Sequence, residues 1–509
     1  MIVRRFAPPL LASALVSGCM VGPDYLGPPN AAPRASAATA FLRADRTTPA
    51  YHPADDWWKA FDDRVLTDLV ETAFANSPSI DMAQARLRQA RAAYAGSRAN
   101  LRPQGSASAV AAQARLGLGD TDSINDGLRS AASAAEDLTG LPVEAPSVPN
   151  HVSTDLYNAA FDASWEIDIF GGNRRAAEQS AAQAEAAEAA LADAQVQLAA
   201  ETAQAYVSLR SSQQQLAIAR HSAELQQTSL NLTRQQAEQG TASDLDIARL
   251  ETQLATTKAD VPVLESEVEQ GLNRLAVLCG LEPGELDARL KSPRSVPRPP
   301  HKVAIGDPAE MLRRRPDIRQ AERKLAAGNA AIGQAVAQYF PKITLIGLAS
   351  SGSTDADKLF DAGSLTLLGG PTLQWNVLSF GRTAARVEQA QAGFDAALAQ
   401  YRQSVLSALE DAESSLSEFR HRQQNVSHLA EADAAASKAA ELMRQMQEAG
   451  TVSVIDVLDV ERQRLQAERG LAQGQAQLTN AFIALEKSLG LGWRPLLAPP
   501  PPEPKLALR

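Results

Sequence analysis

Residues 157–169 read YNAAFDASWEIDI, and they alternate between apolar and polar side chains. Every odd position from Tyr157 to Ile169 is apolar, whereas most even positions carry Asn, Asp, Ser or Glu. A period of two over about ten residues is typical of a membrane β-strand with lipid on one side and water on the other. From this segment alone, a half-buried strand of a soluble sheet is an equal alternative.

The same stretch returns later in the chain, because the sequence is an internal duplication. An offset of 210 residues aligns the later part of the two copies, and an offset of 238 aligns the earlier part. The extra residues of the first copy lie between Pro103 and Trp165, and the Gly-, Ser-, Asp- and Pro-rich residues 117–150 predict a long exposed loop there. The matching pairs are Trp165 and Trp375, Phe170 and Phe380, Gly240 and Gly450, and Gly280 and Gly490 at the first offset, and Pro78 and Pro316, and Pro103 and Pro341 at the second.

Each copy contains one very long predicted helix. Residues 174–239 contain neither Gly nor Pro, and residues 382–449 contain only one Gly. A helix over 174–239 would extend roughly 100 Å at about 1.5 Å per residue. Apolar residues recur every seven positions in it, so close packing of neighbouring helices as in a coiled coil is expected. Shorter helices are predicted over residues 65–101 and 244–279.

The predicted fold class is mixed α-helix and membrane β-strand. The first repeat covers residues 65–290 with a hairpin at about 103–170, and the second covers residues 300–493 with a hairpin at about 341–380. A Pro-rich tail without an assigned role follows at 494–509. Two hairpins give four strands, which cannot close a barrel, and open edges are not tolerated in lipid. The chain is therefore expected to oligomerise, with its long helices outside the membrane in the periplasm.

The N-terminus predicts export and lipidation. Residues 1–18 combine a positive start with a short apolar stretch, which is typical of a signal peptide and is too short to span a membrane. The string VSGC at residues 16–19 resembles a bacterial lipobox. Cys19 is therefore expected to carry a covalent lipid as the first residue of a segment at 19–64. Met20 stands where an Asp would resemble an inner-membrane retention signal, so the outer membrane is expected.

Composition and motifs exclude several classes of function. The 509 residues carry a formal net charge of −10, which provides no basic surface for nucleic acid. The six histidines lack metal-ligand spacing, and no phosphate loop, HExxH or nucleophile elbow occurs. Neither an enzyme nor a metal or other cofactor is expected. Cys279 follows an apolar run and is expected to be a small buried residue. A structural coiled-coil lipoprotein would explain the helices but not the hairpins.

Three short motifs accompany the duplicated hairpins. They are Val21-Gly22-Pro23-Asp24-Tyr25 after Cys19, Trp57-Trp58 with Phe61-Asp62, and Gly450-Thr451-Val452-Ser453-Val454-Ile455-Asp456-Val457-Leu458-Asp459. With the duplication, they make nearly the whole mature chain resemble outer-membrane efflux proteins of the TolC and OprM type, in the NodT-type lipoprotein branch. The resemblance implies a homotrimer with a twelve-stranded β-barrel, four strands per chain, continued by a long periplasmic α-helical barrel.

The implied function is a passive export duct for small molecules in the outer membrane. A periplasmic adaptor protein and an inner-membrane pump of the RND type would deliver the substrate. An outer-membrane channel for type I protein secretion is the alternative, and the substrate, pump and adaptor are left open.

The resemblance also implies where such a channel closes and where it meets its adaptor. Asp456 and Asp459 match acidic positions at the periplasmic constriction, where three copies would form carboxylate rings that favour cations. Two solvated helix acids are the ordinary alternative. Val452 and Gln447 depart from the residues that lock the archetypal channel, so the locking contacts are left open. The implied adaptor-contact tip is Gly240, Thr241, Ser243, Gly450, Thr451 and Ser453, and the two serines also suit helix caps.

Overall fold

The computed structural model describes residues 20–44 and 55–493 of the chain. These residues form two compact units, each assembled from separate stretches of sequence. The first unit contains residues 20–24 together with Tyr94–Glu178 and Asn329–Gln391, and the second contains the other described residues. Each repeat therefore contributes to both units.

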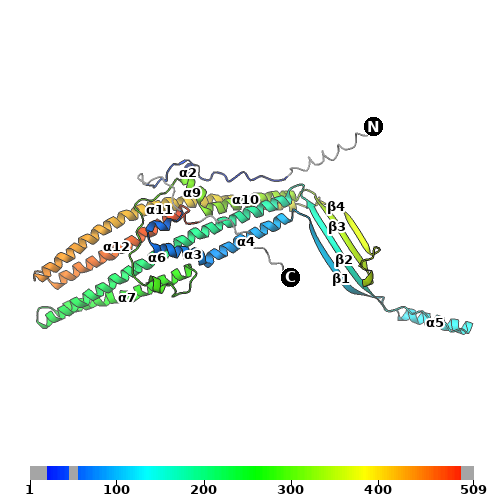
Figure 1. Cartoon of the computed structure of the whole chain (residues 1–509), viewed down its shortest axis with the longest axis horizontal. Coiled ribbons are helices and arrows are strands. Elements are labelled where there is room, and N and C mark those ends of the chain that lie inside the picture. The colour runs from blue at the N-terminus through cyan, green and yellow to red at the C-terminus, as the bar shows by residue number, and fades with distance from the viewer. Residues whose placement is uncertain (1–19, 45–54, 494–509) are drawn as a thin grey trace. The chain divides into compact units, whose positions relative to one another are not determined.

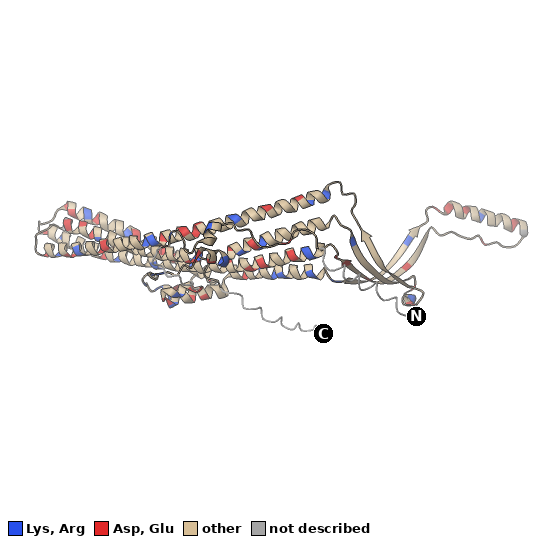
Figure 2. Ribbon diagram, turned by 90° about the horizontal axis from the view of Figure 1, so that it is seen from above, with Lys and Arg blue, Asp and Glu red and all other residues tan. Residues whose placement is uncertain are grey.

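One antiparallel sheet dominates the first unit (Figure 1). Its strands follow chain order, β1-β2-β3-β4, and all lie within the two predicted hairpins. Charged side chains are sparse on the strands and frequent on the helices (Figure 2). The strands are β1 Gln104–Gly117, β2 His151–Ile167, β3 Lys342–Ser353 and β4 Leu365–Gln374.

The two hairpins share one register. Gln104 pairs with Ser164 in the first hairpin. The offsets of 238 and 210 residues convert this pair into Lys342 and Gln374, which are indeed paired in the second hairpin. The duplication read from the sequence is therefore also a duplication of backbone pairing.

The insertion in the first hairpin differs from the predicted loop. Residues 117–150 contain helix α5, Asp122–Thr139, which Gly140 ends with a left-handed φ of 63°. The Pro residues and most of the Gly residues gather at the two ends of the insertion, whereas its middle carries Ala, Leu and Glu, which are good helix formers. The prediction of a loop throughout was wrong, because the composition of the whole range concealed its helical middle.

Long helices belong largely to the second unit, and α6 and α11 begin among residues of the first. Their observed ends differ from the predicted ends by at most two residues. Within residues 20–44 and 55–493, no helix has an apolar stretch long enough to cross a membrane. The long helices and their returning partners are α6 Gly172–Glu238, α7 Asp244–Leu278, α11 Arg382–Glu448 and α12 Val454–Ser488.

The single helix predicted over residues 65–101 is in fact two helices, α3 Arg64–Asn76 and α4 Pro78–Ala99. Ser77 interrupts them with an extended backbone at ψ 126°, because a residue before proline is driven out of the helical conformation. Arg315 makes the same break in the second repeat, at ψ 123°. The remaining helical segments are α2 Pro33–Ala37, η1 Trp57–Phe61, α8 Asp287–Leu290, α9 Pro308–Arg314, α10 Pro316–Ala337 and η2 Ala356–Lys358.

An aromatic cluster joins the segment before α3 to the end of α12. The ring of Phe482 lies 5.2 Å from that of Phe61 and 6.3 Å from that of Trp57, centroid to centroid, in edge-to-face geometry. Trp58 is completely buried and contacts Phe74 in the same way at 5.6 Å. Each such pair adds about 0.5–1.5 kcal/mol beyond the burial of its apolar area. The Trp57-Trp58 motif therefore serves the core of the second unit.

The end of α7 packs closely against the end of α3. Cys279 is fully buried, its thiol donates to the carbonyl oxygen of Leu69 at 3.6 Å, and burial raises its pKa to about 11. This confirms the expectation of a small buried residue. The next residue, Gly280, has a left-handed φ of 68° and lies so near Asn76 that a Cβ would overlap the Asn76 carbonyl oxygen.

We expect Gly280→Ala to destabilise the second unit far more than Gly240→Ala does. Both glycines have a positive φ, so each substitution costs about 1–2 kcal/mol in backbone strain. Only Gly280 has a backbone atom in the way, because a Cβ at Gly240 meets nothing within 4 Å. Thermal unfolding followed by circular dichroism at one scan rate compares them. Equal losses of stability would show that the contact between Gly280 and Asn76 is unimportant.

Candidate functional site

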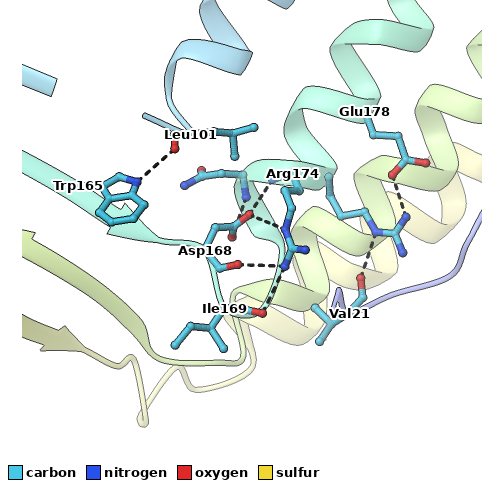
Figure 3. Close-up of polar contacts among 9 residues, drawn as sticks. Val21, Leu101, Trp165, Asp168, Ile169, Arg174 and Glu178 are labelled. Atoms are coloured by element: carbon cyan, nitrogen blue, oxygen red, sulfur yellow. Dashed lines mark hydrogen bonds and ion pairs between the residues drawn. The ribbon is translucent and has the colours of Figure 1, made fainter. Parts of the chain in front are cut away.

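Two tryptophans make the same contact at the helix-side end of each hairpin. Trp165 Nε1 donates to the carbonyl oxygen of Leu101 at 3.1 Å (Figure 3). Trp375 Nε1 donates to the carbonyl oxygen of Tyr339 at 3.0 Å. Each indole ties the strand that leaves the sheet to the chain that enters it. A Trp with an apolar ring and a satisfied N–H suits the interface between membrane and water.

Asp168 determines how the chain turns from β2 into α6. Its carboxylate accepts the backbone N–H groups of Asn173 at 3.2 Å and Arg174 at 2.8 Å. The Arg174 guanidinium in turn donates to the carbonyl oxygens of Asp168 at 3.0 Å and Ile169 at 3.4 Å (Figure 3). A carboxylate at this place satisfies the unpaired N–H groups of a helix N-terminus and complements its dipole.

Arg175 holds the beginning of the described chain, the strap Val21–Asp24. Its side chain is 1% exposed, and it donates to the carbonyl oxygen of Val21 at 3.2 Å. It also forms ion pairs with Asp24 at 2.7 Å and with Glu178 at 2.8 Å, the second of which Figure 3 shows. Burial alone would lower the pKa of Arg175, but the bonds to Glu178 and Asp24 outweigh it and raise the pKa. The buried guanidinium is thus charged, and its hydrogen bonds hold the strap in place.

The residues that hold the strap are those at which the duplication breaks. Asn329 Nδ2 donates to the carbonyl oxygen of Pro23 at 2.9 Å. Gly22 packs directly against Gly333, because a Cβ added to Gly22 would overlap the Cα of Gly333. Arg175, Asn329 and Gly333 correspond to Ala385, Arg91 and Ala95 in the other repeat. Among the described residues the strap contacts these three side chains or glycines but not their counterparts, so it accounts for the three differences. Sequence reasoning missed the strap.

The predicted lipidation residue cannot be placed. Cys19, the signal sequence at 1–18 and the tail at 494–509 lie outside the described residues. The strap nevertheless begins only two residues after Cys19 in the sequence, and it is firmly held.

The two helical hairpin tips have the same backbone geometry. Gly240 and Gly450 have left-handed φ values of 72° and 71°, which glycine adopts without strain after a helix. Thr241 and Thr451 each donate a backbone N–H to a carbonyl five residues earlier, at 2.9 and 3.0 Å. Both tips are exposed, and they lie at the same end of the second unit (Figure 1). The structure thus places both predicted tip segments at one end of the second unit.

Ser243 and Ser453 are the predicted caps of the returning helices, and the structure confirms this. Ser453 Oγ accepts the backbone N–H of Asp456 at 3.3 Å, while the Asp456 carboxylate accepts the Ser453 N–H at 3.2 Å. Ser243 and Asp246 form the same reciprocal capping box. Hydrogen bonds from Ser243 lower the pKa of the Asp246 carboxyl.

Asp456 and Asp459 both lie near the start of α12, but they are not equivalent. Asp456 is occupied in its capping box, a role that the Ser-x-x-Asp spacing could have indicated. Asp459 is 61% exposed and forms an ion pair with Arg462 at 3.4 Å. Its counterpart in the first repeat is Arg249, so neither the duplication nor helix capping explains an acid at Asp459.

Comparison with known proteins gives full-length relatives. Nodulation protein T of Rhizobium leguminosarum bv. viciae is 28% identical over 480 residues, 94% of this chain and 92% of the relative. The toluene efflux pump outer membrane protein TtgF of Pseudomonas putida is 28% identical over 94% of this chain and 95% of its own length. The pyoverdine export outer membrane protein OpmQ of Pseudomonas putida is 30% identical over 87% of this chain and 89% of its own.

Solved structures and a family profile agree with these relatives. The outer-membrane channel OprN matches with a TM-score of 0.78 at 36% identity, over 94% of this chain and all of that one. The CmeC outer membrane channel of Campylobacter jejuni shares the fold, with a TM-score of 0.79 at 20% identity over 93% of this chain and 95% of that one. The outer membrane efflux protein family profile matches residues 69–281 and 308–491. The chain belongs to the outer membrane efflux protein family.

Proposed function

We propose that this chain is the outer-membrane channel of a tripartite efflux system, a passive, non-enzymatic duct that works with a periplasmic adaptor and an inner-membrane pump. The likeness to OprN over 94% of the chain carries the proposal. TtgF and OpmQ are named for the export of toluene and pyoverdine, which favours small molecules over secreted proteins as cargo. Which small molecule this chain exports follows from its partner pump.

The sheet supports a trimeric barrel. Among the described residues, β1 pairs only with β2 and β4 only with β3, so each has one open edge. Open edges are too costly in lipid, and joining β4 of one chain to β1 of the next removes them. Three chains then give twelve strands in a closed barrel.

The duplication predicts the register in which β4 of one chain pairs with β1 of the next. Inside one chain, Ala163 of β2 lies opposite Gly347 of β3, at the junction of the first repeat with the second. Moving Ala163 forward by 210 residues and Gly347 back by 238 places Leu373 of one chain opposite Ala109 of the next. Leu373 is 65% exposed in the single chain, as an edge residue awaiting a partner should be.

Strand β2 has an apolar band of the right height for the outer membrane. The odd positions of β2 are apolar from Tyr157 onward. Before Tyr157 the same face is polar, because Asp155 accepts a hydrogen bond from Gln113 at 3.1 Å and His151 lies 3.2 Å from Arg115. The band rises about 33 Å along the strand, or roughly 23 Å when tilted by about 45°. Such bands in membrane barrels are about 25 Å tall.

The strap fits a lipid anchor on Cys19. A single acyl chain holds a protein to a membrane only marginally, whereas several chains on one residue, together with a barrel, give a stable attachment. The buried Arg175 fixes the chain close to the anchor to the same compact unit that contains Trp165 and Trp375. The lipid and the aromatic residues would then meet the membrane surface together.

The exposed tips and Asp459 fit the periplasmic end. The predicted tip residues from Gly240 to Ser243 and from Gly450 to Ser453 present matching turns, six in a trimer, which an adaptor could contact in a repeated way. Asp459 and Asp456 would face the narrow opening. Because Asp456 already serves the cap, we assign the cation-selecting charge chiefly to Asp459.

We expect inter-chain disulfides at the derived register. With Cys279 replaced by Ala, the pairs Leu373→Cys with Ala109→Cys, and Thr372→Cys with Val110→Cys, are oxidised in membranes. One of these neighbouring pairs occupies a closely spaced, non-hydrogen-bonded site and should form covalent dimers and trimers on denaturing gels.

The matched control is Leu373→Cys with Ala107→Cys, two residues out of register. Its cysteines would lie about 7–8 Å apart, too far for a disulfide. Cross-linking of the control but not of the derived pairs would refute the register, and no cross-linking of any pair would refute the barrel.

We expect the mature protein to begin at Cys19 with lipid attached. Mass spectrometry of the N-terminal peptide should show diacylglyceryl and acyl mass on that residue, because Cys19 carries the only thiol of the lipobox. Cys19→Ala should lose this mass yet keep the trimer, which the barrel holds. An unmodified mature N-terminus in the natural host would contradict the assignment.

We expect Asp459→Asn to weaken cation preference in planar bilayers, because it removes three carboxylates from the trimer opening. The effect should be large near 0.01 M salt, where the Debye length is about 30 Å, and small near 1 M, where it is about 3 Å. Asp246→Asn is the matched control, since it alters a capping box without touching the second repeat. Unchanged selectivity of Asp459→Asn at low salt would remove Asp459 from the gate.

A further inference from the structure

Helix α5 is a feature of the first hairpin alone. It lies in residues 118–150 between β1 and β2, whereas the β3–β4 connection at 354–364 has only the short segment η2. It therefore occurs once per chain, at the strand ends remote from α4 and α6. Its 18 residues are near the lower limit for a helix that is stable alone in water. Stable formation requires packing of its apolar side.

The sequence of α5 has a coiled-coil pattern. Its apolar residues follow the alternating spacing of four and three that defines a heptad seam. The residues beside the seam are uncharged and mostly small, namely Asn125, Gly127, Ala132 and Ala134. The seam itself consists of Ile124, Leu128, Ala131, Ala135 and Leu138. All charged residues of the helix take the outward heptad positions, namely Asp122, Asp126, Arg129, Glu136 and Asp137.

The chain itself covers only one side of this seam. Asn125 exchanges two hydrogen bonds with the backbone of Val148, at 2.9 and 2.7 Å, and thereby holds the returning segment along the helix. Ala132, on that side, is 9% exposed. On the other side Ile124 is 53% exposed and Leu138 is 89% exposed. The helix is thus supported from one flank and leaves large apolar side chains open on the other.

We propose that the open side of α5 packs against the α5 helices of the other two copies, so that three helices form a small parallel bundle over the outer mouth of the barrel. The inference rests on the trimer of the proposed function. A threefold axis makes the copies parallel and equal in height, which is the arrangement a heptad seam requires. Ala131 and Ala135 let the helices approach closely.

Charge favours a second copy over the membrane surface as the occupant. Four acids and one arginine give the helix a net negative outward face. Helices that lie on membranes are rich in Lys and Arg, which attract anionic headgroups. An acidic helix would be repelled by such headgroups, whereas in a bundle its acids face outward into water.

The bundle would restrict the exit of the duct. Cargo that reaches the outer end of the barrel would have to pass between the hairpin stems, or the bundle would have to separate. Its short Ala-rich seam is suited to a contact that opens and closes, because it buries little apolar area per helix.

Single-cysteine cross-linking tests this arrangement. In the Cys279→Ala background, Ile124→Cys, Ala131→Cys and Leu138→Cys are oxidised separately in membranes. Each should link two of the three chains into a covalent dimer. Ser133→Cys, at an outward heptad position of the same helix, is the matched control and should stay monomeric on the gel. The Leu373→Cys with Ala109→Cys pair is run alongside to report barrel assembly.

The outcomes separate this inference from the proposed function. If the barrel pair cross-links while the seam cysteines react no more than Ser133→Cys, the α5 bundle is refuted and the trimer stands. If the barrel pair also fails, the proposed function fails. An environment-sensitive dye is attached to Ala131→Cys. If its emission shifts to that of an apolar environment only when lipopolysaccharide vesicles are added, and the seam cysteines do not cross-link, α5 lies on the membrane and the bundle is refuted.

Conductance gives a second, independent readout. Ile124→Glu with Leu138→Glu places six like charges in the seam of a trimer and should raise single-channel conductance. Ser130→Glu with Ser133→Glu adds the same charge on the outward face and should leave conductance unchanged. Equal conductance of the two variants would refute a restricting bundle.

Discussion

Backbone N–H and C=O groups at a strand edge cannot remain unsatisfied in lipid, and the rest of the structure depends on this constraint. A four-stranded sheet has two such edges, at β1 and β4. The internal duplication makes these edges complementary, because the contact of β2 with β3 already joins a first repeat to a second. Pairing β4 with β1 of another copy repeats a contact that the chain makes within itself.

Some departures from the duplication coincide with contacts or elements that occur in one copy only. Where both copies agree, as in the capping boxes of Ser243 and Ser453, the residues serve helix and turn geometry. Three of the differences between the copies illustrate such departures. Arg175 in place of an alanine holds the strap, Asp459 in place of an arginine places an acid near the tip, and α5 occurs in one hairpin only.

The sequence indicated the features that depend on local chemistry. The absence of Gly and Pro located α6, and serine before the returning helices indicated their caps. The sequence analysis missed two kinds of feature, namely local features hidden by their surroundings and contacts between residues far apart in the chain. The break at Ser77 depends on a single proline, and α5 is flanked by loop-forming residues that dominate the composition. The strap depends on contacts such as Arg175 with Val21, which are far apart in sequence and follow no periodic pattern.

The folded unit in the membrane must consist of three chains, since one chain leaves β1 and β4 open. Native mass spectrometry of the protein extracted from outer membranes in mild detergent tests this most directly. The predicted result is one dominant species with the mass of three chains, which releases single chains of equal mass when activated. A stable, folded species with the mass of one chain would contradict the account.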